Sequence, residues 1–216
     1  MNAKKLLSNP FILIGGALVL AVTIYGSLTL YEQSFTELPI LGPKDEKKTG
    51  EERYHHIPDF KLIDQFGDTV TNERFDGKVY IADFFFTHCP TICPVMTSNL
   101  RKIQKKYDPG EVAIASYSVD PKRDSSKRLM EYAERYDVNH ENWTFLTGDK
   151  KQIYLLARNG YFISATEGTG GPNDFIHSDL FTLVDRKGRI RGYYRGTKDD
   201  AIQQLMNDID KLKSTP

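Results

Sequence analysis

Cysteine is scarce in this sequence, because only Cys89 and Cys93 occur among its 216 residues. A disulfide between two such close positions would close a very short loop and remove little entropy from the unfolded chain. A chain of this length can also bury a substantial core without a cross-link. The cysteine pair therefore indicates chemistry rather than a structural staple.

The sequence also lacks net charge and internal repeats. It holds 29 basic and 29 acidic residues, and the basic residues are interspersed rather than clustered. A nucleic-acid-binding protein would present a basic patch or stripe. We therefore expect no nucleic-acid partner.

Only one long uncharged run is present, FILIGGALVLAVTIYGSLTL at residues 11–30. Its length is about that of an α-helix that crosses a bilayer. A cleaved signal peptide is the alternative, since its apolar core also follows a short basic stretch such as Lys4-Lys5. Signal cores are shorter, roughly 7–15 residues, and no convincing cleavage site follows this run. We expect a single uncleaved transmembrane anchor.

The charges beside this run predict its orientation. Lys4 and Lys5 precede it, whereas the first charges after it are Glu32 and Glu37. The positive-inside rule then predicts that residues 1–10 are cytoplasmic. The rest of the chain is expected on the periplasmic side of the inner membrane.

Two further regions follow the anchor. Residues 31–56 include the charged run KDEKKTGEER and show no sustained apolar period, so we expect a flexible tether. Residues 57–216 are long enough for one ordinary domain with its own core.

Strands and helices are predicted to alternate along that domain. The apolar run VYIADFFFT at residues 79–87 is typical of a strand that is buried on both faces of a sheet. A small hairpin is expected at 60–68, before this strand. Further strands are expected at 112–119, 143–146, 180–185 and 190–194. Helices are expected at 96–107, at 151–158 and at 199–212, and another helix begins after an Asp124-Ser125 cap. This order predicts an α/β fold, a three-layer α/β/α sheet of the thioredoxin type.

The two cysteines lie where the first long strand passes into a helix. Pro94 suits the first turn of a helix, where its missing N–H would be unpaired anyway. A helix N-terminus favours negative charge and lowers the pKa of a nearby thiol. Such a dithiol can exchange disulfides or bind a soft metal ion. Two thiolates suit Cu(I), and a neutral imidazole can complete a trigonal site.

Five histidines could supply that imidazole. We expect His55 and His56 on the tether, and His140 in a polar segment, to be solvated. His88 directly precedes the first cysteine, and a residue beside a ligand generally points elsewhere. His177 follows a glycine-rich stretch that could reach across the sheet, so a structural role and a ligand role both stay open.

Three segments of the chain resemble the Sco (SenC) family. These are FTHCPTICP, SVDPKRD and HSDLFTLVDRKG, and they occur in the order and at the spacing of that family. The similarity runs over essentially the whole exported domain and includes the anchor. The family consists of membrane-anchored, thioredoxin-like copper chaperones of cytochrome c oxidase assembly.

The resemblance implies a copper site made by Cys89, Cys93 and His177, with one ion bound per chain. It implies delivery of copper to the dinuclear CuA site of cytochrome c oxidase subunit II, reduction of the cysteines of that site, or both. A copper donor and a thiol reductant are then further partners.

Four other features of the sequence bear on this expected copper site. Thr91-Ile92 stands where the family commonly has an acidic-containing pair, and Thr182 where an aromatic residue is frequent. Met96 lies on an apolar stripe and is expected in the core. Asp120 could orient the site by hydrogen bonding or cap a loop.

The residues themselves also allow other functions. A thiol–disulfide reductase or peroxidase would use Cys89 to attack and Cys93 to resolve, without obligatory metal. A copper or redox sensor is a third reading of the same pair. Zinc competes with copper, since two cysteines, one histidine and a water form a known zinc arrangement.

Overall fold

The computed structural model of the chain describes residues 10–45, 53–163 and 178–214. It divides into two units, Met1–Leu38 and Pro39–Pro216. The first unit contains helix α2 (Pro10–Thr36), which includes the expected anchor segment. Within the residues that the structure describes, no helix combines the length and the apolarity of a membrane span.

The second unit is built on a mixed seven-stranded sheet with the order β4-β3-β7-β6-β5-β8-β9. Strands β5, β6 and β7 are parallel, whereas β3 and β8 flank them in antiparallel pairing. The bounds of the strands are β3 Lys61–Asp64, β4 Thr69–Thr71, β5 Val79–Phe85, β6 Val112–Ser118, β7 Trp143–Thr147, β8 Leu180–Val184 and β9 Ile190–Arg195.

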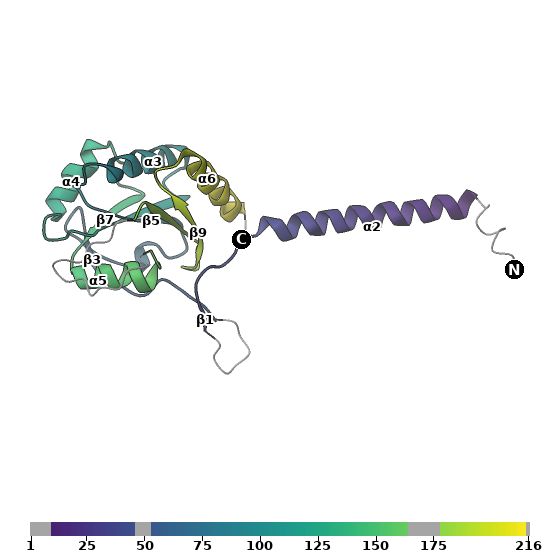
Figure 1. Cartoon of the computed structure of the whole chain (residues 1–216), viewed down its shortest axis with the longest axis horizontal. Coiled ribbons are helices and arrows are strands. Elements are labelled where there is room, and N and C mark those ends of the chain that lie inside the picture. The colour runs from purple at the N-terminus through teal and green to yellow at the C-terminus, as the bar shows by residue number, and fades with distance from the viewer. Residues whose placement is uncertain (1–9, 46–52, 164–177, 215–216) are drawn as a thin grey trace. The chain divides into compact units, whose positions relative to one another are not determined.

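Helices cover both faces of this sheet. The helices are α3 Ile92–Lys106, α4 Ser126–Arg135, α5 Lys150–Leu155 with its π-helical continuation η2 Leu156–Gly160, and α6 Asp199–Ser214; a 3₁₀ turn, η1, spans Asn72–Arg74. Figure 1 shows α3, α4 and α6 on one side of the strands and α5 on the other. The three-layer α/β/α arrangement predicted from the sequence is confirmed.

The central strands are apolar on both faces because each face packs against helices. Every residue of β5 is buried, and successive side chains point to opposite faces. Phe85 packs against Tyr132 of α4 with ring centroids 5.3 Å apart, while Phe84 packs against Tyr161, after η2, at 5.6 Å. The carboxyl end of β5 lies between these two helical layers, and the chain continues from there to the cysteines.

The compact unit begins at Pro39, inside the range 31–56 where we expect a flexible tether, and described residues of that range contact the domain. The backbone N–H of Leu41 donates to Ile190 at 2.8 Å, and Arg191 Nε donates to the carbonyl of Pro39 at 3.0 Å. Short strands β1 (Lys44–Asp45) and β2 (Arg53–Tyr54) pair with each other.

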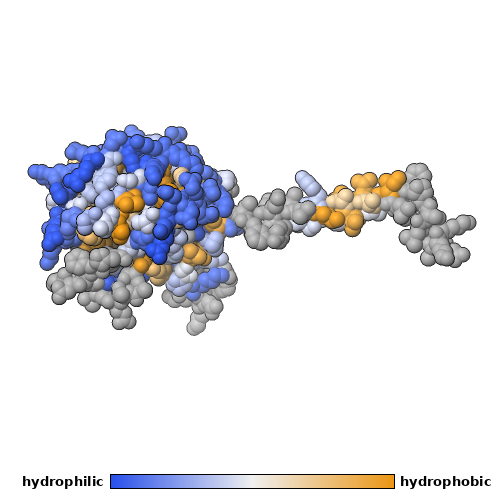
Figure 2. Space-filling view, turned by 45° about the horizontal axis from the view of Figure 1, so that its top comes forward, coloured by the Kyte–Doolittle hydropathy of each residue, from blue (hydrophilic) through white to orange (hydrophobic). Residues whose placement is uncertain are grey.

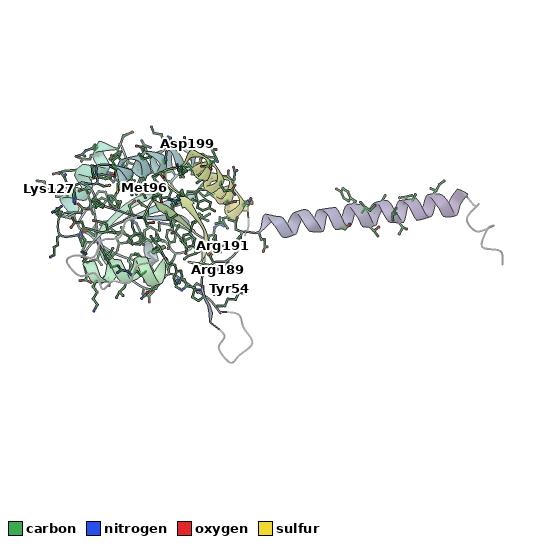
Figure 3. All side chains as sticks on the ribbon, in the orientation of Figure 1. Tyr54, Met96, Lys127, Arg189, Arg191 and Asp199 are labelled. Carbon is green, nitrogen blue, oxygen red and sulfur yellow. The ribbon has the colours of Figure 1, made fainter. Side chains whose placement is uncertain are left out.

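Figure 3 shows Arg189, Arg191 and Tyr54 grouped on this side of the unit, and the Arg189 guanidinium lies 5.9 Å from the centre of the Tyr54 ring. The compact unit includes this segment because β9 is an edge strand of the sheet, and an edge strand can pair with a further piece of chain. Leu41 forms such an antiparallel bridge with Ile190.

Candidate metal centre

The two cysteines lie on either side of the strand-to-helix junction. Strand β5 ends at Phe85, and the N–H of Cys89 donates to the carbonyl of Phe86 at 3.3 Å in a tight turn. Cys93 is in the first turn of α3. Both are free thiols, Cys89 9 % exposed and Cys93 2 % exposed. Cys89 is therefore the sulfur nearer to solvent.

The environment of Cys89 favours its thiolate. Burial raises the pKa of this thiol, but hydrogen bonds from the backbone of Cys93 and of Thr91, and from their side chains, outweigh burial and lower the pKa below its ordinary value. The Thr91 hydroxyl lies 4.0 Å from the sulfur. The lowered pKa predicted from the helix N-terminus thus belongs to Cys89, with the amides of the first turn as its cause.

Cys93 behaves in the opposite way. Burial raises the pKa of its thiol well above the ordinary value, and the nearby Cys89 and Asp83 raise it further, while a hydrogen bond from the Phe86 backbone only partly offsets them. The environment therefore favours ionisation of Cys89 and opposes ionisation of Cys93. Such a pair can attack a disulfide, or it can bind a soft cation whose charge drives the second proton off.

A buried carboxylate, Asp83, lies in β5 on the approach to the cysteines, and sequence reasoning missed it. It is 2 % exposed and accepts a hydrogen bond from Ser116 Oγ, which in turn accepts one from Trp143 Nε1 at 2.9 Å. Burial raises the pKa of Asp83 to about 7. The available signal was one acidic residue within the apolar run VYIADFFFT.

His88 and Asp120 meet beside the Cys89 turn. Asp120 Oδ2 lies 3.5 Å from His88 Nε2, and Arg123 Nη1 lies 2.8 Å from the same nitrogen. The Asp120 carbonyl also accepts the backbone N–H of Arg123 and of Asp124. Asp120 thus closes a turn, as expected of a loop cap, and lies beside the neighbour of the first cysteine. Its role in orienting the site stays a prediction.

The remaining histidines differ in their surroundings. His55 is half-buried, with Nε2 2.7 Å from the Gly160 carbonyl and its ring 4.5 Å from Phe162, so the expectation that it is solvated is wrong. His140 is also half-buried, and its Nδ1 lies 3.2 Å from Gln65 Nε2. His177 lies outside the described residues. Among those that are described, no cluster of three or more potential ligands occurs.

Two further expectations concern the core around the site. Met96 is fully buried, which confirms that it packs in the core. Thr182 is also fully buried, and within the described residues its hydroxyl has no hydrogen-bond partner. An aromatic side chain would fill this position without leaving a buried polar atom unpaired.

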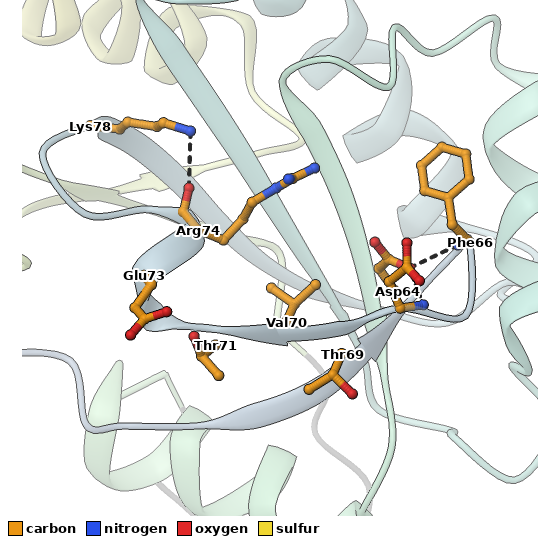
Figure 4. Close-up of a pocket in the computed structure, with 9 residues that line it drawn as sticks. Asp64, Phe66, Thr69, Val70, Thr71, Glu73, Arg74 and Lys78 are labelled. Atoms are coloured by element: carbon orange, nitrogen blue, oxygen red, sulfur yellow. Dashed lines mark hydrogen bonds between the residues drawn. The ribbon is translucent and has the colours of Figure 1, made fainter.

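An open hollow of about 460 Å³ lies at the other edge of the sheet, along the β3–β4 hairpin (Figure 4). Its charged groups are engaged locally: Asp64 accepts the backbone N–H of Phe66 at 2.9 Å, and Lys78 Nζ donates to the carbonyl of Arg74 at 3.0 Å. The hollow is lined by residues between Asp64 and Lys78 and is separate in sequence from the dithiol.

Comparison with known proteins shows which family the chain resembles. The family model described as SCO1/SenC matches residues 48–214. The SCO1 protein homolog of Bacillus subtilis strain 168 is 34 % identical over 158 residues, which cover 72 % of this chain and 81 % of the relative.

Solved structures agree with the sequence match. BsSco, described as having a disulfide switch and as a member of the Sco family of cytochrome c oxidase assembly proteins, gives a TM-score of 0.64 at 32 % identity, covering 75 % of this chain and 95 % of BsSco. Bradyrhizobium japonicum ScoI with copper bound gives 0.55 at 27 % identity, covering 72 % and 98 %. The thioredoxin-like form of the α/β fold is thereby supported. Because the family model covers most of its length, this chain belongs to the SCO1/SenC family.

Proposed function

We propose that the chain binds one copper ion through Cys89, Cys93 and His177 and delivers it to the CuA site of cytochrome c oxidase subunit II. The observation that carries the proposal is the pair of free thiols at the start of α3, in which Cys89 has a lowered pKa. Thiolates are ligands that Cu(I) prefers. A relative, Bradyrhizobium ScoI, has been solved with copper bound, and the HSDLFTLVDRKG segment supports His177 as the third ligand.

The thiols would take up the ion in order. Cys89, more exposed and already disposed to ionise, meets the ion first. The positive charge then lowers the pKa of Cys93, which loses its proton to solvent as the second sulfur binds. Release follows when thiolates of the receiving protein replace Cys89 and Cys93 one at a time, so that the ion is never free.

Reduction of the receiving protein's cysteines is a second candidate, favoured by the same lowered pKa. The Cys89 thiolate attacks a disulfide sulfur and releases one partner thiolate. Cys93 then loses its proton and attacks the Cys89 sulfur, which releases the second. The partner gains two electrons and the chain is left with a Cys89–Cys93 disulfide, which a thiol reductant must reduce again.

Anaerobic titration of the reduced chain with Cu(I) tests the first proposal. We expect one ion per chain in the reduced form and none in the disulfide form. Cys93→Ser and His177→Ala should each lose tight binding, whereas the matched control His140→Ala should retain it. Full Cu(I) affinity in Cys93→Ser or His177→Ala would overturn the ligand set, and the same titration with Zn²⁺ tells which metal is preferred.

We propose further that residues 11–30 anchor the chain in the membrane, with the domain on the periplasmic side and residues 1–10 in the cytoplasm. The large apolar side chains of α2 described between Ile14 and Tyr25 are solvent-exposed, and Figure 2 shows orange, hydrophobic residues along this helix. Extraction of the full chain from bacterial membranes by detergent but not by alkaline carbonate supports the anchor. A domain protected from protease added to spheroplasts would contradict its location.

A further inference from the structure

A second buried carboxylate, Asp124, is bonded to the chain segment that leads into the cysteine turn. Its side chain is fully buried. Asp124 Oδ2 accepts the backbone N–H of Thr87 at 3.0 Å and Ser118 Oγ at 2.6 Å, and Oδ1 accepts Thr87 Oγ1 at 2.6 Å. Three donors therefore converge on one carboxylate, which is what a buried charge requires.

These bonds join three pieces of chain at one end of the sheet. Thr87 lies two residues before Cys89, and Ser118 is the last residue of the neighbouring strand β6. Asp124 comes from the loop between β6 and α4. The Asp120 N–H also donates to Ser118 Oγ at 3.2 Å, which holds the same loop against β6.

Asp124 does not cap helix α4, although the sequence made it a candidate for that role. Asp124 and Ser125 were both candidates to cap α4, but Ser125 is the cap and accepts the N–H of Arg128 at 3.3 Å. Asp124 instead turns inward, and Arg128 Nε approaches Thr87 Oγ1 at 3.3 Å. Within the part of the chain that the structure describes, the segment that Asp124 holds outside its own loop and β6 is the one that carries the first cysteine.

We propose that Asp124 is a positioning residue for the dithiol, fixing Thr87 so that the Cys89 sulfur is held against Cys93 at the start of α3. The consequence for copper affinity rests on the proposed function, whereas the consequence for the disulfide does not. Without the three bonds, the segment before Cys89 is no longer tied to Ser118 of β6, although Arg128 still contacts Thr87 and Asp120 still contacts His88. The two sulfurs then meet less often in the geometry that a shared ion or a disulfide needs.

Asp124→Asn tests this with little change of volume. An amide can accept from the Thr87 hydroxyl, but its NH₂ cannot accept from the Thr87 N–H or from Ser118. The matched control is Asp208→Asn, which removes another buried carboxylate with three donors, from Tyr194 Oη, Gln204 and Lys211, all on β9 and α6. Both variants are made in the full-length chain.

Two quantities are measured beside the melting temperature. One is Cu(I) affinity, by competition with bathocuproine disulfonate, and the other is the reduction potential of the Cys89–Cys93 disulfide in dithiothreitol buffers without metal. Loss of a partner that orients a ligand typically lowers metal affinity about 10–100-fold. We expect a fall in that range for Asp124→Asn together with a shifted potential, and neither change for Asp208→Asn at a comparable loss of melting temperature.

The outcomes separate the two proposals. A wild-type chain that binds no copper would overturn the proposed function, while a potential shifted only in Asp124→Asn would still support positioning. If Asp124→Asn keeps the wild-type Cu(I) affinity and the wild-type reduction potential of the disulfide, the proposal that Asp124 positions the dithiol is wrong. If that variant does not fold, Thr87→Ala and Thr87→Ser decide: a shift in the alanine variant that serine reverses supports the proposal, and wild-type values in both overturn it.

Discussion

Cys89 and Cys93 influence each other's ionisation through their side chains, yet their pKa values move in opposite directions from the ordinary value. First-turn amides act on Cys89, whereas burial dominates at Cys93. The inequality makes one sulfur the point of first contact for a metal ion or a disulfide. It also leads to a direct chemical prediction.

In the reduced chain at pH 7, iodoacetamide should modify Cys89 at least about tenfold faster than Cys93, because the thiolate is the reactive form. Tandem mass spectrometry of the peptide that contains both residues measures the site of labelling over time. In concentrated urea the two rates should become similar, which serves as the control. Equal labelling of both cysteines in the folded chain would contradict the assignment.

Asp83 should make the stability of the fold depend on pH. Its pKa is raised from 3.8 to about 7 by burial, so between these values the folded state binds more protons than the unfolded state. Stability therefore falls as pH rises through this window, by at most about 4 kcal/mol for a shift of about 3 units. Urea unfolding of Asp83→Asn and of its parent, in a Cys89→Ser/Cys93→Ser background, should show the variant gaining relative stability from pH 4 to pH 8.

Asp208→Asn is the control for Asp83→Asn, because the pKa of Asp208 is lowered whereas that of Asp83 is raised. Burial raises the pKa of Asp208, but hydrogen bonds from Lys211, Gln204 and Tyr194 outweigh it, and the pKa is lowered. Its stabilisation is present at neutral pH and is lost as pH falls through the lowered pKa. This variant should thus lose most stability near pH 7 and least in acid. The same pH trend in both variants would contradict the difference in environment.

Trp143 should report the ionisation of Asp83 optically. It is the only tryptophan of the chain, is 1 % exposed, and donates through Nε1 to Ser116, which donates to Asp83. The negative charge that Asp83 gains on ionisation lies two hydrogen bonds from the indole of Trp143 and changes the electric field there. Tryptophan fluorescence should titrate near pH 7 in the parent and stay flat over that range in Asp83→Asn. An unchanged titration in the variant would assign it to another group.

The segment from Pro39 to His56 should contribute to the stability of the domain. Among the described contacts, a chain that starts at Ile57 loses the hydrogen bonds from Leu41 to Ile190, from Arg191 to Pro39 and between His55 and Gly160. At roughly 0.5–1.5 kcal/mol each, these bonds amount to about 1.5–4.5 kcal/mol relative to a chain that starts at Pro39. Urea unfolding of the two chains measures the difference, and equal midpoints would contradict a stabilising role for these contacts.

Periodicity in the sequence was sufficient for most of the fold. The run at 79–87 appears as β5 over Val79–Phe85, and the expected strand at 112–119 as β6 over Val112–Ser118. Buried strands and amphipathic helices carry their environment in their own residue pattern. Helix α3 begins four residues earlier than the expected Met96, at Ile92, because Pro94 is accommodated within the first turn.

Asp83 and Asp124 show where such reasoning stops. Each is a single acidic residue, and its partners, Ser116 for the first and Thr87 with Ser118 for the second, come from other segments of the chain. Nothing in the local pattern distinguishes a buried carboxylate that accepts three hydrogen bonds from a solvated one. Likewise, the pairing of Leu41 with β9 depends on a free sheet edge that is formed by distant residues.

The scarcity of cysteine, the spacing of the pair and the strand that precedes it were enough to predict a reactive dithiol on an α/β sheet, because short-range order is encoded in neighbouring residues. Only the tertiary structure decided which sulfur ionises, which carboxylates are buried beneath and beside the turn, and where the domain begins. Those properties arise from burial and from hydrogen bonds between segments far apart in the chain, and they exist only once the sheet has assembled.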